Sequence, residues 1–126
     1  MIIVNGSVSE TIPVMDRGLL YGDGVFRTMR VEAGRIDSWP AQYRKLAADC
    51  AALDIPCPAQ TVLEREAEQA IAGEAECVLK IIVSRGEGGR GYGVPSSVRP
   101  GRVIVTAPLP VHPAHYRDAG VRLHLC

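Results

Sequence analysis

The sequence predicts a small α+β domain, and three observations support this prediction. The 126 residues suit a single domain with one modest core. Several short runs of alternating or β-branched apolar residues, bounded by glycine, proline or asparagine, predict strands. Two other stretches, at 41–53 and 59–72, have apolar residues at intervals of three and four, which predicts helices.

The N-terminal part predicts a hairpin followed by a glycine turn. Ile2–Val4 is a short apolar run, and Asn5-Gly6 is a strong signal for a two-residue turn. In residues 16–31, DRGLLYGDGVFRTMRV, two glycines flank Asp23, and a two-residue alternation follows at once. One side of that predicted strand carries Val25, Arg27, Met29 and Val31, and the other carries Phe26, Thr28 and Arg30. Such a turn lets the backbone approach a ligand closely, although an ordinary half-buried strand shows the same pattern.

The two predicted helices lie in the middle of the chain. Pro40 fits the first turn of the helix at 41–53, because proline lacks the amide hydrogen that a helix interior needs. Its apolar face is expected to comprise Tyr43, Leu46, Cys50 and Leu53. The helix at 59–72 is followed by Gly73, at the position of a C-cap glycine. Its apolar face is expected to comprise Val62, Ala67, Ala70 and Ile71.

The second half predicts two further strands. Residues 77–83, CVLKIIV, are almost continuously apolar, which predicts a central strand covered on both faces. Residues 102–107 predict the next strand, and three prolines within six residues then predict a stiff linker. A helical turn is expected at 114–119 and a final strand at 121–125.

These elements predict two unequal parts of the chain. Residues 1–112 form the predicted small α+β domain. A strand of about six residues cannot be a domain by itself, because it needs a sheet to pair with. We therefore interpret 113–126 as the linker and first strand of a second domain that this chain does not contain.

The composition excludes several classes of partner. Fourteen basic and fourteen acidic residues cancel, so no net field favours nucleic acid or an anionic membrane. No apolar run approaches the roughly 20 residues of a membrane span, and the N-terminus lacks the layout of a secretory signal. The four cysteines have no CxxC spacing, which favours structural thiols over disulfides or zinc ligands. We expect no metal site and a cytoplasmic location.

A second glycine-rich stretch, SRGEGGRGYG at 84–93, follows the strand predicted at 77–83. It matches G-x-G-x-x-G, but no helix start follows Gly91, so a dinucleotide site is rejected. A P-loop and an arginine–glycine RNA-binding segment are rejected as well. The loop is expected to present Arg85, Arg90 and Tyr92, and an arginine offers a planar fork suited to a carboxylate. The alternative, a solvated surface loop without a ligand, stays open.

The glycine turn, the helix WPAQYRKLAADC and the loop together resemble the N-terminal domain of the class IV, or fold-type IV, pyridoxal-phosphate enzymes. The order and spacing of the three stretches agree over nearly the whole chain. Within this family the likeness is greatest to the aminodeoxychorismate lyases, mainly because of the GRGY form of the loop. D-amino-acid and branched-chain transaminases of the same family are the alternative.

The resemblance implies a homodimer whose subunits have two domains, with pyridoxal phosphate between the domains and a mixed or antiparallel sheet in the small one. Lys45 takes the place of the family's phosphate-binding arginine. A lysine brings charge to a phosphate without the bidentate fork. Phe26 and Thr28 match residues that line the substrate pocket, and Arg90 and Tyr92 match loop positions that reach a substrate carboxylate, often across the dimer. Asp23 is expected to shape the turn rather than to touch substrate, and Tyr21 to line the neighbouring pocket.

The resemblance also implies that this chain carries no catalytic residue. The chain has two lysines, Lys45 and Lys80, and the second is interpreted as a strand residue with its head in water. In the family the lysine that attaches to the cofactor lies in the second domain. The implied reaction is conversion of aminodeoxychorismate to 4-aminobenzoate and pyruvate. A non-catalytic domain is the third hypothesis, and we expect the chain to expose an apolar face and to self-associate.

Overall fold

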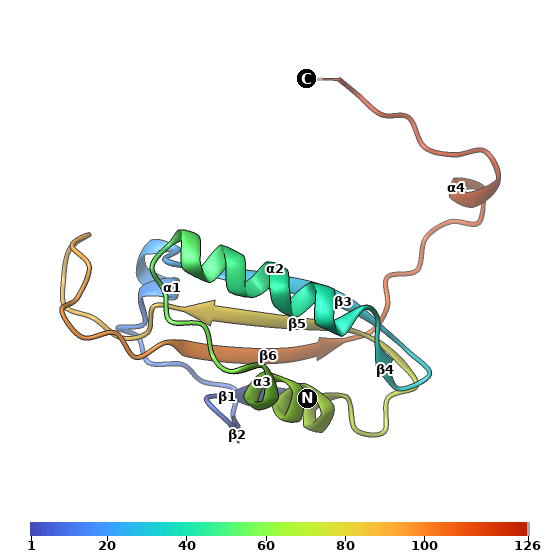
Figure 1. Ribbon diagram of the computed structural model, residues 1–126. Helices are drawn as coiled ribbons and strands as arrows, with labels where there is room; N and C mark the ends of the chain where they lie inside the picture. Colours follow the sequence, from blue (N-terminus) through green and yellow to red (C-terminus); the bar gives the residue numbers. More distant parts are fainter. Residues whose placement is uncertain (126) are drawn as a thin grey trace.

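The structure is a computed structural model that describes residues 1–125, and these residues form one antiparallel sheet and four helices (Figure 1). The strands are β1 (Ile2–Val4), β2 (Ser7–Val8), β3 (Gly24–Glu32), β4 (Arg35–Ile36), β5 (Glu76–Ser84) and β6 (Gly101–Ala107). The helices are α1 (Arg17–Tyr21), α2 (Trp39–Ala52), α3 (Gln60–Ile71) and α4 (His115–Asp118). The α+β prediction is therefore confirmed. α2 and α3 are the two predicted helices, α4 is the predicted helical turn, and α1 was not predicted.

The sheet has the strand order β2-β1-β6-β5-β3-β4, and every pairing in it is antiparallel. β5 lies between β6 and β3, so the prediction of a central strand is correct. Arg27 pairs with Ile81, which pairs with Ile104. Because opposite residues in an antiparallel pair share a face, this register continues each strand's alternation across the sheet.

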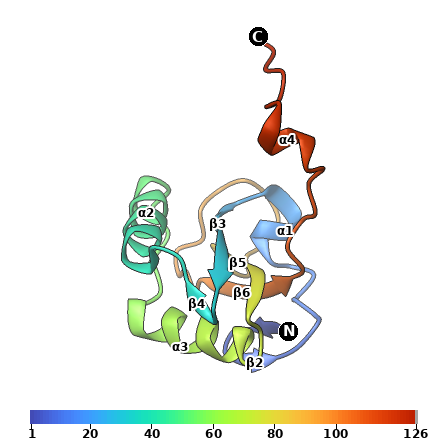
Figure 2. The ribbon, with the colours of Figure 1, turned by 90° about the vertical axis from the view of Figure 1, so that its right-hand side faces the viewer.

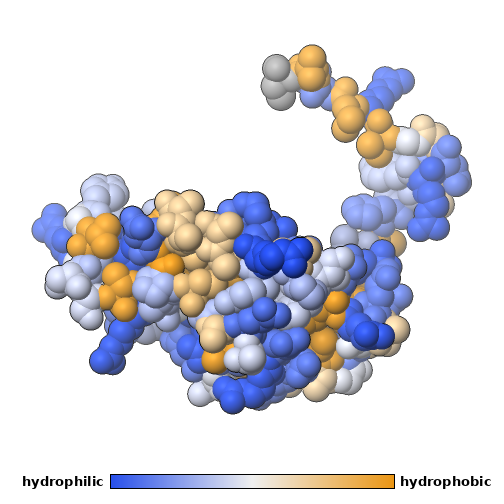
Figure 3. Space-filling model, viewed as in Figure 1, coloured by the Kyte–Doolittle hydropathy of each residue, from blue (hydrophilic) through white to orange (hydrophobic). Residues whose placement is uncertain are grey.

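α2 and α3 cover one face of the sheet, as Figure 2 shows from the end of the molecule. The core lies between this face and the helices. Its sheet residues include Ile3, Met29, Val31, Leu79, Ile81, Val83 and Ile104. The helices contribute Leu46, Cys50, Leu63, Ala67, Ala70 and Ile71. The outer surface on the helix side is mainly polar (Figure 3).

Two details of the predicted helix faces are wrong. Leu53 follows the last residue of α2 and is 43% exposed, because the helix ends before Leu53 can join its apolar face. In α3 the fully buried side chain is Leu63, whereas Val62 is only half-buried. Residues 63, 67, 70 and 71 recur at the helical period and centre the apolar face one residue later than predicted.

The expectation that β5 is covered on both faces is also wrong for the described chain. Ile81 and Val83 are buried beneath the helices, but Val78, Lys80 and Ile82 on the opposite face are only half-buried. No helix of residues 1–125 packs across that second face (Figure 2). We call this the bare face; its members on the central strands include Phe26, Thr28, Val78, Lys80, Ile82, Val103 and Val105.

Residues 108–125 run away from the sheet and carry only α4 (Figures 1 and 2). The strand predicted at 121–125 is wrong, because these residues form no strand. Their alternation has no neighbouring strand to pair with in the described chain, and backbone hydrogen bonds to a partner are what make a strand. The domain division at 112 stays a prediction. Among residues 1–125, every helix is too short or too polar to cross a membrane.

Candidate functional site

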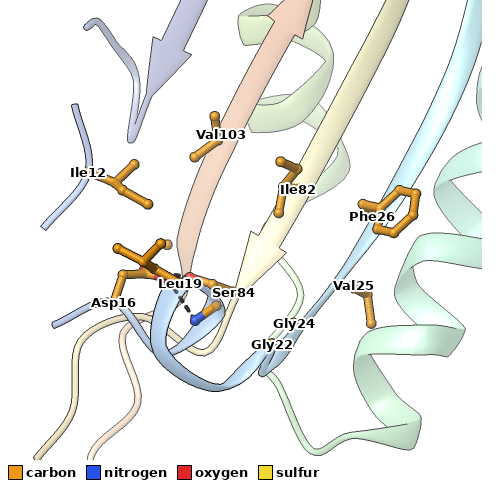
Figure 4. Close-up of a pocket in the computed structure, with 12 residues that line it drawn as sticks. Ile12, Asp16, Leu19, Gly22, Gly24, Val25, Phe26, Ile82, Ser84 and Val103 are labelled. Atoms are coloured by element: carbon orange, nitrogen blue, oxygen red, sulfur yellow. Dashed lines mark hydrogen bonds between the residues drawn. The ribbon is translucent and has the colours of Figure 1, made fainter. Parts of the chain in front are cut away.

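A cavity of about 390 Å³ opens where the bare face meets α1 (Figure 4). Its walls are mostly apolar. They comprise Ile12, Leu19, Val25, Phe26, Ile82 and Val103, with Asp16, Gly18, Gly22, Gly24, Ser84 and Gly101 at the end of the sheet. Side chains from β3, β5 and β6 thus meet residues of the glycine turn, so the cavity joins two regions that are distant in sequence.

Asp16 and Ser84 form the polar end of this cavity. Asp16 precedes α1 and caps it, because its Oδ1 accepts a hydrogen bond from the Gly18 amide at 2.8 Å. Its Oδ2 accepts a hydrogen bond from Ser84 Oγ at 2.7 Å (Figure 4). The last residue of β5 is therefore tied directly to the start of α1, and both carboxylate oxygens are occupied.

The glycine turn brings its backbone against β5. Gly22 ends α1 with φ of +66°, a conformation that side chains disfavour. A Cβ on Gly24 would lie 2.7 Å from the Val83 carbonyl oxygen, which is too close for any other residue. The predicted glycine turn is present, and the neighbour that its backbone approaches is a strand of the same chain. Its approach to a ligand stays a prediction.

Phe26 and Thr28 both lie on the bare face, as their alternation predicts. Phe26 is 59% exposed and borders the cavity, and the Lys80 Nζ lies 4.4 Å from the centre of its ring. Thr28 pairs with Lys80 in the register of β3 and β5. Lys80 therefore covers an aromatic ring on the face that carries the predicted substrate residues, an attractive cation–π contact.

Asp23 has the structural role in the glycine turn that the sequence predicts. Its Oδ2 accepts hydrogen bonds from Arg17 Nε and Arg85 Nε, each at 2.8 Å. The hydrogen bond from Arg85 and the one from Arg17 lower the pKa of Asp23 against the opposing effect of burial, so this carboxyl stays ionised. Arg17 and Arg85 are both buried, and Asp23 offsets one of their two positive charges at the end of the sheet.

The loop between β5 and β6, residues 85–100, contains no helix, as the sequence after Gly91 predicts. Arg90 is exposed and Tyr92 is 86% exposed, and neither lines the cavity of the single chain. The structure therefore does not bring the two predicted loop residues together with Phe26 and Thr28. Their assignment to a substrate stays a prediction.

Lys45 lies on the outer surface of α2, where its side chain is 57% exposed and pairs with Asp49 one turn later. It does not line the cavity. Gln42, on the same helix, accepts hydrogen bonds from Arg27 Nε at 3.1 Å and Arg27 Nη2 at 2.8 Å. The assignment of Lys45 to a cofactor phosphate stays a prediction.

The sequence analysis missed three polar residues that organise this end of the sheet: Asp16, Arg17 and Ser84. Its expectation that the loop presents Arg85 is wrong, because Arg85 is buried against Asp23 and two backbone carbonyl groups. An arginine in a glycine-rich turn is usually exposed, and the sequence offers no sign that Arg17 and Arg85 share one carboxylate. The only available signal was that Asp16 and Gly22 flank a short stretch, as an N-cap residue and a C-cap glycine flank a helix.

Comparison with known proteins identifies the family to which this fold and its cavity belong. The model of the amino-transferase class IV family matches residues 24–126. The chain belongs to the class IV aminotransferase family. It is 35% identical over 127 aligned positions to the aminodeoxychorismate lyase of Vibrio harveyi, which covers 100% of this chain and 46% of that enzyme.

Solved structures agree with this placement. The crystal structure of 4-amino-4-deoxychorismate lyase from Pseudomonas aeruginosa matches with a TM-score of 0.89 and 36% identity, over 98% of this chain and 45% of that one. The branched-chain amino acid aminotransferase of Escherichia coli matches with a TM-score of 0.80 over 90% of this chain and 41% of that one; at 17% identity this likeness shows the fold alone. The chain spans a little under half the length of these relatives.

Proposed function

We propose that this chain is the N-terminal, substrate-facing part of a 4-amino-4-deoxychorismate lyase, which converts aminodeoxychorismate to 4-aminobenzoate and pyruvate. The observation that carries the proposal is its likeness to the Pseudomonas aeruginosa lyase, which extends over 98% of the chain at 36% identity. The Vibrio harveyi lyase supports the same reaction at 35% identity.

The bare face is suited to contact with a flat, ring-shaped substrate. Phe26 offers an exposed aromatic surface beside an apolar cavity, and Thr28 offers a hydroxyl on the same strand and face. Phe26 and the cavity walls would exclude water from one side of the ring. Arg90 would bind a substrate carboxylate through its fork, and Tyr92 would lie beside it.

Pyridoxal phosphate is the proposed cofactor, and this chain would contribute one contact to it. Lys45 is exposed, and an ammonium has three hydrogens, so its pairing with Asp49 leaves donors for a phosphate. Lys45 would thus donate one hydrogen bond to the phosphate. When bound, the cofactor would supply an electron sink for the bonds that break. No residue of this chain is assigned a catalytic role.

Expression from the complete reading frame that contains this chain provides the test of the proposal. With pyridoxal phosphate and aminodeoxychorismate, we expect equal amounts of pyruvate and 4-aminobenzoate. Arg90→Gln should raise KM about tenfold, the size of one charge-assisted hydrogen bond, with a smaller change in kcat. Arg35→Gln, which changes an exposed arginine on β4, is the matched control and should leave KM unchanged. Equal KM values for the two variants would contradict the proposed role of Arg90 in binding the substrate carboxylate.

The same assay separates the alternatives. A hypothetical aminotransferase of Mycobacterium tuberculosis, solved with α-ketoglutarate and pyridoxamine phosphate, is 26% identical with a TM-score of 0.73, which makes a transaminase the second candidate. Exchange between glutamate and an oxoacid without 4-aminobenzoate would favour it. Absence of both activities would favour a non-catalytic domain. Borohydride that fixes the cofactor to Lys45 or Lys80 of the 126-residue chain would contradict the absence of a catalytic lysine.

We also propose a homodimer in the cytoplasm. A dimer would let Arg90 and Tyr92 of one subunit reach the cavity of the other, which they do not line in the single chain. Cys50, Cys57 and Cys77 are free thiols, which suits a reducing compartment.

A further inference from the structure

Arg17 is a buried arginine whose hydrogen bonds lead to a surface loop. Its side chain is 3% exposed at the start of α1. Nε donates to Asp23 Oδ2 at 2.8 Å, Nη1 donates to the Gly91 carbonyl oxygen at 3.0 Å, and Nη2 donates to the Tyr92 carbonyl oxygen at 3.2 Å. All three nitrogens are used, and two of them bind consecutive carbonyl groups of the loop.

Tyr21, one turn further along α1, binds the same point of the loop. Its hydroxyl oxygen accepts a hydrogen bond from the Gly91 amide at 2.9 Å, and its ring lies 5.3 Å from the ring of Tyr92. The guanidinium carbon of Arg17 lies 4.9 Å above the Tyr21 ring. Both polar backbone groups of Gly91 are thus bound by side chains of α1, at a residue whose φ of +105° favours glycine.

Asp23 connects this arrangement to the rest of the domain. Besides Arg17 it binds Arg85, whose Nη1 and Nη2 donate to the carbonyl oxygens of Asp54 and Leu53 at 3.0 and 2.7 Å. The position of Arg17 is therefore fixed from the core side through Asp23 and from the loop side through two carbonyl groups. A planar guanidinium is pre-organised for such multiple contacts, whereas a lysine is not.

In this loop the backbone is held by hydrogen bonds, whereas the side chains of two residues are exposed. The backbone at 91–92 is held by Arg17 and Tyr21, while the side chains of Arg90 and Tyr92 stay exposed. Exposed glycine-rich loops are normally mobile, and an arginine must be held in place to bind a carboxylate with good geometry.

We propose that Arg17 and Tyr21 are positioning residues for the loop: they hold its backbone so that Arg90 and Tyr92 are presented to the substrate. The link to substrate rests on the proposed function, whereas the holding of the loop does not. The two parts can therefore be tested separately, the first in the 126-residue chain and the second in the protein from the complete reading frame.

Amide hydrogen exchange and trypsin cleavage test the holding of the loop. Tyr21→Phe removes only the hydroxyl that accepts the Gly91 amide, so Gly91 should exchange about tenfold faster while amides of β5 keep their rates. Arg17→Met should speed trypsin cleavage after Arg90 about tenfold or more, giving a fragment that ends at Arg90. Glu66→Gln is the control, because it weakens the buried pair of Glu66 with Arg102 and lowers global stability without touching the loop.

The results separate positioning from general destabilisation. Cleavage after Arg90 in Arg17→Met should exceed that in Glu66→Gln at temperatures where both variants are equally folded. Equal cleavage would overturn the proposal, and so would an unchanged Gly91 exchange rate in Tyr21→Phe. Tyr21→Phe keeps the ring and its packing, so its result decides the question even where Arg17→Met does not fold.

The link to substrate is tested in the protein from the complete reading frame. Tyr21→Phe and Arg17→Lys should raise KM for aminodeoxychorismate. Arg17→Met should raise KM more than Arg17→Lys does. kcat should change less than KM, because the chemistry takes place at other groups. A loosened loop with an unchanged KM would refute the positioning part alone. Absence of 4-aminobenzoate from the unsubstituted protein would instead refute the proposed function and leave the loop result intact.

Discussion

The two faces of the β-sheet are built by the same strands, yet their surroundings differ. Ile81 and Ile82 are neighbours on β5 with the same side chain; the first is fully buried under α2 and α3, and the second borders a cavity on the bare face. Among residues 1–125, α2 and α3 both pack on one face, and only the short α1 reaches the end of the other. The comparison shows that apolar residues on a strand do not by themselves distinguish a core face from a face that makes contacts outside the domain.

The largest expected effect is a difference in stability between Ile81→Ala and Ile82→Ala. Ile81→Ala should lower the free energy of unfolding by about 3 kcal/mol, because it leaves a cavity in the core. Ile82→Ala should cost about 1 kcal/mol or less, since its side chain stays partly in contact with water. Urea unfolding followed by circular dichroism measures both values. Equal losses would show that the bare face is part of the core.

The second prediction concerns the end of the sheet, where ion pairs replace apolar packing. Asp23→Asn should lower the free energy of unfolding by about 2 kcal/mol at pH 7 through loss of charge-assisted hydrogen bonds with Arg85 and Arg17. Because the folded chain holds the pKa of Asp23 below its ordinary value of 3.8, the advantage of the unsubstituted chain is complete above about pH 5. It should disappear as the pH falls through the lowered pKa.

Urea unfolding of both chains between pH 7 and pH 2 measures this difference. Glu32→Gln is a suitable control, because Glu32 and Arg30 form an exposed pair and its loss should change stability by less than about 0.5 kcal/mol. A difference between Asp23→Asn and the unsubstituted chain that stays constant down to pH 2 would contradict the assigned cause.

The smallest effect should be on self-association of the 126-residue chain. If the bare face is where copies meet, Ile82→Thr combined with Val103→Thr should raise the dissociation constant about tenfold, or about 1.4 kcal/mol. Val94→Thr changes an exposed apolar residue of the loop and is the control. Sedimentation velocity over a concentration series measures the constants. A stable monomer at high concentration would contradict the expected association, and an equal change in the control would place the contact elsewhere.

The features that the sequence predicts correctly are those that depend on residues close together in the chain. The hairpin at Asn5-Gly6, Pro40 in the first turn of α2, and the alternation of β3 each follow from backbone preferences or side-chain period. That alternation placed Phe26 and Thr28 correctly on one face. It did not show which face the helices cover, because Lys80 and Arg27 interrupt the apolar pattern on opposite faces.

The candidate site was less predictable because its organising contacts join residues far apart in sequence. Ser84 binds Asp16 across 68 positions, and Arg17 binds Gly91 across 74. An arginine that is buried by such contacts looks in the sequence like any exposed one. The strand expected at 121–125 failed for the related reason that pairing, and not pattern, makes a strand.

The sequence by itself determined the α+β class, the two main helices, the glycine turn and the family of this protein, since these depend on local spacing and on motifs. Only the tertiary structure decided that one sheet face is bare, that Asp23 holds two buried arginines, and that α1 binds the loop backbone at Gly91. The physical reason is that burial and hydrogen bonding belong to pairs of residues, and those pairs exist only after the chain has folded.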